Sequence, residues 1–199
     1  MYTLVGSPKT RSFRVLWMLE ELGLEYQVEA VGPRTPEILE LNPSGKLPVL
    51  KDGDDAIIDS TAIIQYLADK HNKLTFAAGT IERAKQDSFT CFALDDLDGI
   101  LWGAAKHSFI LPEELRSRDV KPASQFDFAK SLITLEKRLG DNKYVMGDVF
   151  TVPDIIITHC AGWAANAKFD WPEGPLSDYV DRVRKRPAYI RANEVRSAS

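Results

Sequence analysis

Three hydroxyl side chains, Ser7, Thr10 and Ser12, lie where a short β-favouring run gives way to a helical pattern. The first turn of a helix offers unpaired backbone N–H groups and about half a positive charge, so an anion can bind there. Hydroxyl groups at this place can also serve only as helix caps. The cluster is therefore either an anion-binding turn or an ordinary helix start, and its residues alone leave both interpretations open.

Two further pairs stand at the starts of predicted elements: Leu47-Pro48 before a strand and Asp59-Ser60 before a helix. An X-Pro bond can be cis, which would expose the backbone groups of the preceding residue to a ligand. A trans proline at a sheet edge explains the first pair equally well. Asp and Ser are common N-cap residues, so the second pair by itself says nothing about a ligand.

The elements that would position these residues alternate over residues 1–75. The pattern predicts a strand at 2–5, a helix that ends at Gly23, a strand at 26–31, a short helix that begins after Thr35, a hairpin around Gly53 and a helix from Ser60. A β-α-β unit requires a parallel strand pair, and the hairpin adds antiparallel strands. This order matches a thioredoxin-like α/β domain.

The chain from residue 80 onward has helical patterns throughout, after a linker at 72–79. We expect helices at 81–107, 122–139, from 152, at 175–186 and at 187–196. Thr151 and Asp154 have the spacing of a capping box, and the helix that they begin is apolar nearly all round. Residues 80–199 are therefore expected to form an all-α helical bundle, with that helix at its centre.

The composition restricts the possible partners. The chain has 199 residues, of which 44% are hydrophobic and 27% charged, which excludes intrinsic disorder. A net charge of −4 argues against nucleic acid and anionic membranes as partners. Cys91 and Cys160 form no pattern, which favours a reducing, cytoplasmic location. The three histidines lack metal-ligand spacing, so we expect no metal site.

Five segments together resemble the soluble glutathione S-transferases: SPKTRSFRVLWMLEELGLEY, LNPSGKLPVL, DSTAIIQYL, GDVFTVPDI and RVRKRPAYIRA. They occur in the family's order and cover nearly the whole chain. The resemblance, to the bacterial serine- or threonine-type members, implies a cytoplasmic homodimer that joins the glutathione thiol to a small electrophilic hydrophobic substrate, as in detoxification. The alternatives are a glutathione-dependent isomerase or dehalogenase, and a non-catalytic protein that binds glutathione or hydrophobic ligands.

The resemblance implies that Thr10 activates the glutathione thiol, with Ser7 and Ser12 as the other candidates. Threonine stands here where serine or tyrosine is usual, and Arg11 stands where redox-type relatives carry cysteine. Shifting a thiol pKa from ~8.5 to roughly 7 requires about 2 kcal/mol. A hydroxyl donor to a charged acceptor supplies about 1.5–3 kcal/mol, and a helix N-terminus about 0.3–1 kcal/mol. A hydroxyl at a helix start is therefore sufficient without a general base.

The same resemblance assigns the remaining contacts to the tripeptide. It implies that the backbone of Leu47, before the family's cis-proline Pro48, pairs with the cysteinyl amides of glutathione. Asp59 and Ser60 would hold the γ-glutamyl end, although Asp59 reaches less far than the usual Glu or Gln. Lys46 would contact the glycine carboxylate of glutathione, and Arg34 would give further help with a carboxylate.

The hydrophobic substrate is expected to bind residues of the helical part. Trp102, His107 and Phe109 lie near the end of its first long helix and could line an apolar pocket. Packing or surface roles would explain each of these side chains equally well. The sequence does not identify the substrate.

Overall fold

The computed structural model describes residues 1–198 and consists of two compact units. The first, called here the N-terminal unit, comprises Met1–Ala77 together with the chain from Arg184 onward. The second, the helical unit, comprises Ala78–Val183. The predicted fold class, a thioredoxin-like α/β domain followed by an all-α domain, is confirmed.

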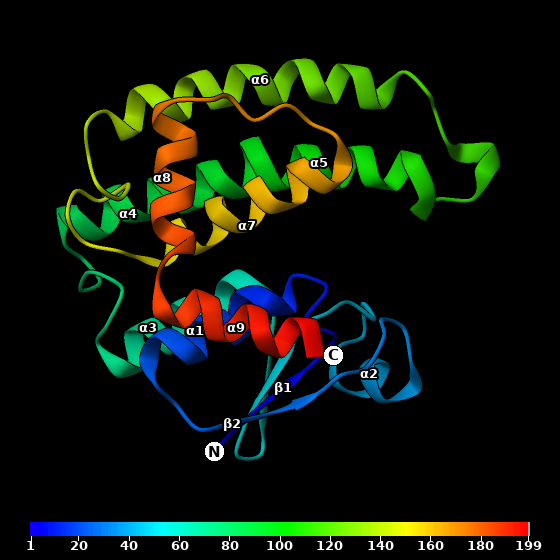
Figure 1. The fold of residues 1–199 in the computed structure, drawn as a ribbon. Coiled ribbons are helices and arrows are strands. Elements are labelled where there is room, and N and C mark those ends of the chain that lie inside the picture. Colours follow the sequence, from blue (N-terminus) through cyan, green and yellow to red (C-terminus); the bar gives the residue numbers. More distant parts are fainter. Residues whose placement is uncertain (199) are drawn as a thin grey trace. The chain divides into compact units, whose positions relative to one another are not determined.

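A four-stranded sheet of order β2-β1-β3-β4 forms the centre of the N-terminal unit (Figure 1). β1 (Tyr2–Val5) pairs in parallel with β2 (Tyr26–Glu29) and antiparallel with β3 (Val49–Asp52). β4 (Asp55–Ile58) completes a hairpin with β3, as the Gly53 turn predicted. The sheet thereby fixes the carboxyl end of β1 beside the start of β3. The hydroxyl cluster follows that end of β1, and Leu47-Pro48 directly precedes β3.

Three helices follow these strands. α1 (Ser12–Leu22) is buried along nearly its whole length and ends at Gly23, whose φ of 67° is the left-handed cap that the sequence predicted. α3 (Ser60–His71) packs against α1. The short α2 (Pro36–Leu41) buries Ile38 against Val5 and Val49, and Leu47 packs on the same cluster.

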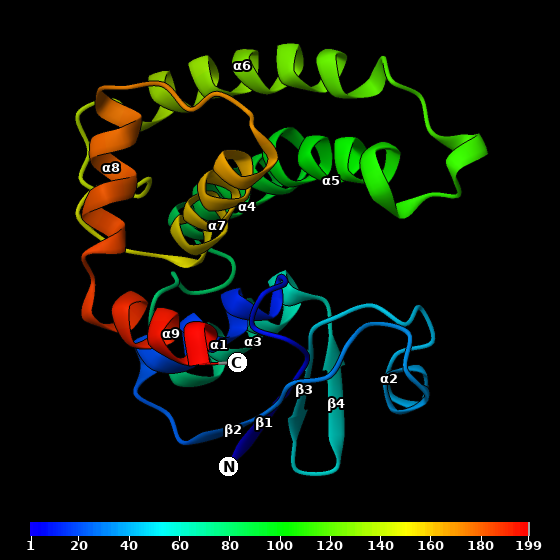
Figure 2. The ribbon, with the colours of Figure 1, turned by 45° about the vertical axis from the view of Figure 1, so that its right-hand side comes forward.

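The last helix, α9 (Pro187–Ala198), lies beside α1 in the N-terminal unit (Figure 2). The helical pattern predicts this segment in the all-α domain of residues 80–199, whereas the structure divides the chain differently. The reason is a set of contacts that no local pattern reveals. The ring of Tyr189 meets that of Trp17 edge-on at 4.9 Å, and Arg186 binds both carboxylate oxygens of Glu21 at 2.7 and 2.8 Å.

The helical unit contains α4 (Ile81–Phe92), α5 (Gly99–Ala105), α6 (Val120–Leu139), α7 (Val152–Ala167) and α8 (Pro175–Arg184, whose last residue belongs to the N-terminal unit). α5 and α6 run side by side (Figure 1). The helix predicted at 81–107 is present but carries π-helical segments at Ala93–Asp98 and Lys106–Ile110. A short 3₁₀ turn, Glu113–Leu115, precedes α6.

α7 is the buried centre of this unit, and its capping box is confirmed. Asp154 is fully buried and accepts hydrogen bonds from the backbone N–H groups of Val145 (3.1 Å) and Thr151 (2.8 Å). The hydroxyl of Tyr179 on α8 donates to the same carboxylate at 2.8 Å. The Asp154 carboxylate therefore links the backbone at Val145, the start of α7 and α8 through hydrogen bonds.

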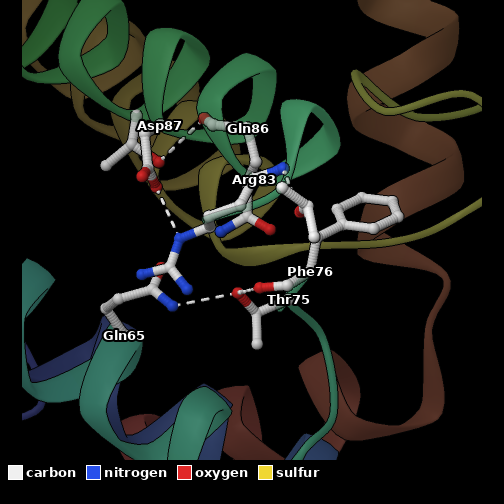
Figure 3. Close-up of polar contacts among 8 residues, drawn as sticks. Gln65, Thr75, Phe76, Arg83, Gln86 and Asp87 are labelled. Carbon is white, nitrogen blue, oxygen red and sulfur yellow. Dashed lines mark hydrogen bonds and ion pairs between the residues drawn. The ribbon is translucent and has the colours of Figure 1, made fainter. Parts of the chain in front are cut away.

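The predicted linker begins after α3, and polar contacts within each unit hold its two ends (Figure 3). In the N-terminal unit, Gln65 Nε2 donates to Thr75 Oγ1 at 2.9 Å. In the helical unit, Thr80 caps α4 through its hydroxyl, and Arg83 binds Asp87 one turn further on at 2.8 Å. Within residues 1–198, none of the helices is both long enough and apolar enough to cross a membrane.

Candidate glutathione site

Gly6, directly after β1, lies beside Ser12 of the hydroxyl cluster and beside Leu47 of the loop that precedes β3, called here the proline loop. Its φ is 134°, and a Cβ there would lie 2.6 Å from Ser12 Oγ and 3.2 Å from the side chain of Leu47. A side chain at residue 6 is therefore excluded, and the start of α1 and the loop before β3 both lie against Gly6. The Leu47-Pro48 bond is cis, as the resemblance implied.

The three hydroxyl groups differ in exposure. Thr10 is half-buried, and its Oγ1 donates to the carbonyl oxygen of Ser7 at 2.8 Å. Ser12 is fully buried, and its Oγ lies 3.0 Å from Thr10 Oγ1. Ser7 is half-buried, and its Oγ accepts a hydrogen bond from the backbone of Lys9 at 3.3 Å. Thr10 and Ser7 can therefore meet a ligand, whereas Ser12 has no exposed surface.

The start of α3 carries the second predicted pair. Asp59 has a φ of 71°, and its exposed carboxylate accepts from the backbone N–H groups of Thr61 (2.8 Å) and Ala62 (3.1 Å). Ser60, the first residue of the helix, is only 4% exposed. The carboxylate of Asp59 is thus engaged as the helix cap that its type predicted.

Arg14 is not among the residues predicted from the sequence, yet it lies against Ser60. It lies in the first turn of α1, is fully buried, and its Nη1 donates to Ser60 Oγ at 3.4 Å. This contact joins the start of α1 to the start of α3. The available signal was a cation inside an otherwise apolar helical run, a pattern that more often places the charge on a solvated face.

Arg34 and Lys46 come from neighbouring loops. The backbone N–H of Arg34 donates to the carbonyl oxygen of Gly45 at 2.9 Å, one residue before Lys46. The side chain of Asn42 holds the carbonyl oxygen of Lys46 at 2.9 Å. Both cationic side chains are exposed, so the structure leaves two cationic donors on adjoining loops open to solvent.

The three residues predicted to line a substrate pocket all belong to the helical unit. Trp102 and His107 are half-buried, and the His107 ring accepts from the backbone of Ser117 at 3.1 Å. Phe109 is 65% exposed. A hollow of about 490 Å³ in this unit includes none of the three and is lined by residues of α4, α6 and the 145–146 segment: Ile81, Ala84, Lys85, Ser88, Phe89, Arg138, Val145 and Met146.

Comparison with known proteins finds relatives of the whole chain and of its first part. The sequence profile described as "Glutathione S-transferase, N-terminal domain" matches residues 10–70. A glutathione S-transferase of Triticum aestivum is 30% identical over 190 residues, which cover 91% of this chain and 87% of the wheat protein. The chain belongs to the glutathione S-transferase family. The predicted family is therefore confirmed, whereas membership of a bacterial serine- or threonine-type subgroup stays a prediction.

This glutathione S-transferase family member is also similar to a longer protein of another name and to a solved structure. Elongation factor 1-gamma 2 of Oryza sativa is 28% identical over 161 residues, and the chain spans only 38% of that protein's length. The crystal structure of the glutathione transferase URE2P6 from Phanerochaete chrysosporium, in complex with oxidized glutathione, has a TM-score of 0.85 and 26% identity. That alignment covers 99% of this chain and 96% of the other. Among residues 1–198 there is no cluster of three side chains suited to holding a metal ion.

Proposed function

We propose that this chain is a glutathione transferase that binds glutathione at the edge of the N-terminal unit and activates its thiol. The observation that carries the proposal is the position of Gly6, which has both Ser12 at the start of α1 and Leu47 before the cis-proline beside it. The contact between Arg14 and Ser60 brings a third element, the start of α3, to the start of α1. These are the elements on which the family resemblance placed the tripeptide contacts.

Each part of the tripeptide has a matching group. The backbone of Leu47 is the proposed partner of the cysteinyl amides, next to Pro48. The hydroxyl and the backbone N–H of Ser60 are the proposed donors to the γ-glutamyl carboxylate, with Asp59 as acceptor for its amine. The exposed Lys46, together with Arg34 on the neighbouring loop, is proposed to approach the glycine carboxylate.

Thr10 is the proposed activating group. A hydroxyl hydrogen can rotate, so the Thr10 proton can turn from the Ser7 carbonyl oxygen to the sulfur of glutathione. Donation to the thiolate favours the ionised form and lowers the thiol pKa, and the thiol proton leaves to solvent. The sulfur lone pair then forms a carbon–sulfur bond to the electrophile, whose leaving group departs with the bonding electrons. Trp102, His107 and Phe109 are the proposed contacts to the hydrophobic substrate.

A second candidate, a non-catalytic binding protein on the same fold, is favoured by one observation. The match to elongation factor 1-gamma covers 77% of this chain, so the fold also occurs within a longer protein of another name. A fold does not determine an activity, and glutathione binding without turnover would fit this candidate. The homodimer and the cytoplasmic location remain part of the first proposal.

Turnover of a chloronitroaromatic substrate in the presence of glutathione distinguishes the candidates. The transferase proposal predicts steady formation of the thioether, with a large loss in Thr10→Ala and most activity kept in Thr10→Ser. Ser131→Ala is a matched control, because Ser131 is a buried serine of α6 whose hydroxyl donates to the Asp127 carbonyl oxygen of its own helix. Glutathione binding without product, across a panel of electrophiles, would favour the non-catalytic candidate instead.

A further inference from the structure

The hydroxyl oxygen of Thr10 has a complete set of hydrogen-bond partners. A hydroxyl group has one proton and two lone pairs, and Thr10 gives its proton to the Ser7 carbonyl oxygen at 2.8 Å. The backbone N–H of Ser12 donates to Thr10 Oγ1 at 3.2 Å. In the 3.0 Å contact between the two side-chain hydroxyls, Ser12 is therefore the donor.

Ser12 itself is out of reach of a ligand. Its side chain is fully buried, and its Oγ lies against Gly6, where a Cβ would approach it to 2.6 Å. Any glycine-to-alanine change at residue 6 would displace this hydroxyl. The fold thus keeps space at residue 6 for a hydroxyl that bonds to Thr10.

We propose that Ser12 is a positioning residue that acts on the glutathione thiol through Thr10. Its two donors occupy both lone pairs of Thr10 Oγ1, so the Thr10 hydrogen swings only from the Ser7 carbonyl oxygen to a sulfur bound on the same side of Oγ1. A hydroxyl that accepts hydrogen bonds is also a stronger donor, because chains of hydrogen bonds polarise one another. The inference rests on the proposed function, in which Thr10 donates to the thiolate.

A double-mutant cycle on the glutathione-bound protein tests this role. The ultraviolet absorbance of the bound thiolate, followed against pH, gives the thiol pKa in the unaltered protein, Ser12→Ala, Thr10→Ala and the double variant. We expect Ser12→Ala to raise that pKa by about 0.3 to 0.5 unit, with glutathione affinity nearly unchanged. In the Thr10→Ala background, Ser12→Ala should not shift the thiol pKa further, because the hydroxyl through which Ser12 acts is already absent.

The controls separate this role from a structural one. Ser131→Ala removes another buried serine hydroxyl and should leave the bound thiol pKa unaltered. If Ser12→Ala does not fold, Ser12→Cys retains a side chain of similar size with a weak donor and should shift the pKa in the same direction. An unchanged pKa in Ser12→Ala or Ser12→Cys, or an equal shift in the Thr10→Ala background, would overturn the inference. Absence of glutathione binding by the unaltered protein would overturn the proposed function itself, and the role of Ser12 with it.

Discussion

Arg14 Nη1 lies 3.4 Å from Ser60 Oγ, and both side chains are almost completely buried. The guanidinium thereby occupies a lone pair of the Ser60 oxygen, which leaves the hydroxyl proton to point toward another acceptor. The start of α3 adds the partial positive charge of a helix N-terminus. This arrangement suits a carboxylate, and under the proposed function Arg14 is therefore a second positioning residue for the tripeptide.

The first prediction concerns Arg14→Lys, which keeps the charge but shortens and reshapes the donor. Lysine cannot reproduce the planar guanidinium, so Ser60 loses its partner and glutathione affinity should fall about tenfold. Calorimetric titration measures the affinity, and a thermal melt checks that the variant is folded. Equal affinity in a folded Arg14→Lys variant would show that Arg14 only fills the core.

The second prediction concerns Lys46 and the glycine carboxylate. Lys46 is exposed, so its truncation in Lys46→Ala should weaken glutathione binding by no more than about fivefold. The effect should disappear for glutathione esterified at the glycine carboxylate, because the ion pair is then absent from both proteins. A loss of the same size for the ester would place the contact of Lys46 elsewhere on the ligand.

The third prediction concerns the pH dependence of stability. Burial raises the pKa of Asp154 from 3.8 to about 6, and the hydrogen bonds donated by Thr151, Val145 and Tyr179 limit the rise. Between about pH 4 and 6 the folded chain keeps a proton that the unfolded chain has released. The free energy of unfolding should therefore fall by about 3 kcal/mol as the pH rises through this window.

The variant Asp154→Asn isolates this effect, because it does not titrate. Chemical denaturation of both proteins at several pH values should show a flatter profile for the variant between pH 4 and 6. Tyr179→Phe removes a donor to the carboxylate, so it should extend the window to higher pH. Parallel profiles for the unaltered protein and Asp154→Asn would contradict a raised pKa.

The fourth prediction concerns the attachment of α9 to α1. The Glu21 side chain is 6% exposed and is bound by Arg186 and by Trp17 Nε1 at 3.0 Å. Arg186→Met leaves that carboxylate without its cation, which should lower the free energy of unfolding by about 2 kcal/mol, discounted for the partial exposure of Arg186. Urea denaturation measures the change.

Lys51→Met is the matched control for the attachment of α9. Lys51 pairs with Glu29 at 3.2 Å on the surface of the same unit, where an exposed pair contributes at most about 1 kcal/mol. A loss in Arg186→Met no larger than in Lys51→Met would mean that the Arg186–Glu21 pair holds α9 no more strongly than an exposed ion pair would.

Local signals predicted most of the fold. The Gly23 cap, the hairpin turn at Gly53 and the Thr151–Asp154 capping box each depend on residues close together in the chain. The position of α9 could not be predicted this way, because Glu21 and Arg186 are 165 residues apart. The π-helical segments were also missed, since one extra residue in a turn barely alters an apolar pattern.

The candidate site was predictable in its elements but not in its contacts. Residue types marked the hydroxyl turn, the proline loop and the α3 cap, and the family resemblance joined them. Only the three-dimensional structure distinguishes the buried Ser12 from the accessible Thr10, because their side chains are chemically alike. The burial of Arg14 could not be predicted from the sequence, because it depends on neighbours such as Ser60 that belong to another helix.

Titration of glutathione into the full chain, followed by calorimetry, is the most direct test of the central claim. The proposed function predicts saturable binding with a dissociation constant below about 1 mM. Ser60→Ala should weaken that binding about tenfold by removing the donor at the start of α3, whereas Ser131→Ala should not. Absence of saturable binding at millimolar glutathione, or equal affinity in Ser60→Ala, would contradict the placement of glutathione at this edge of the sheet.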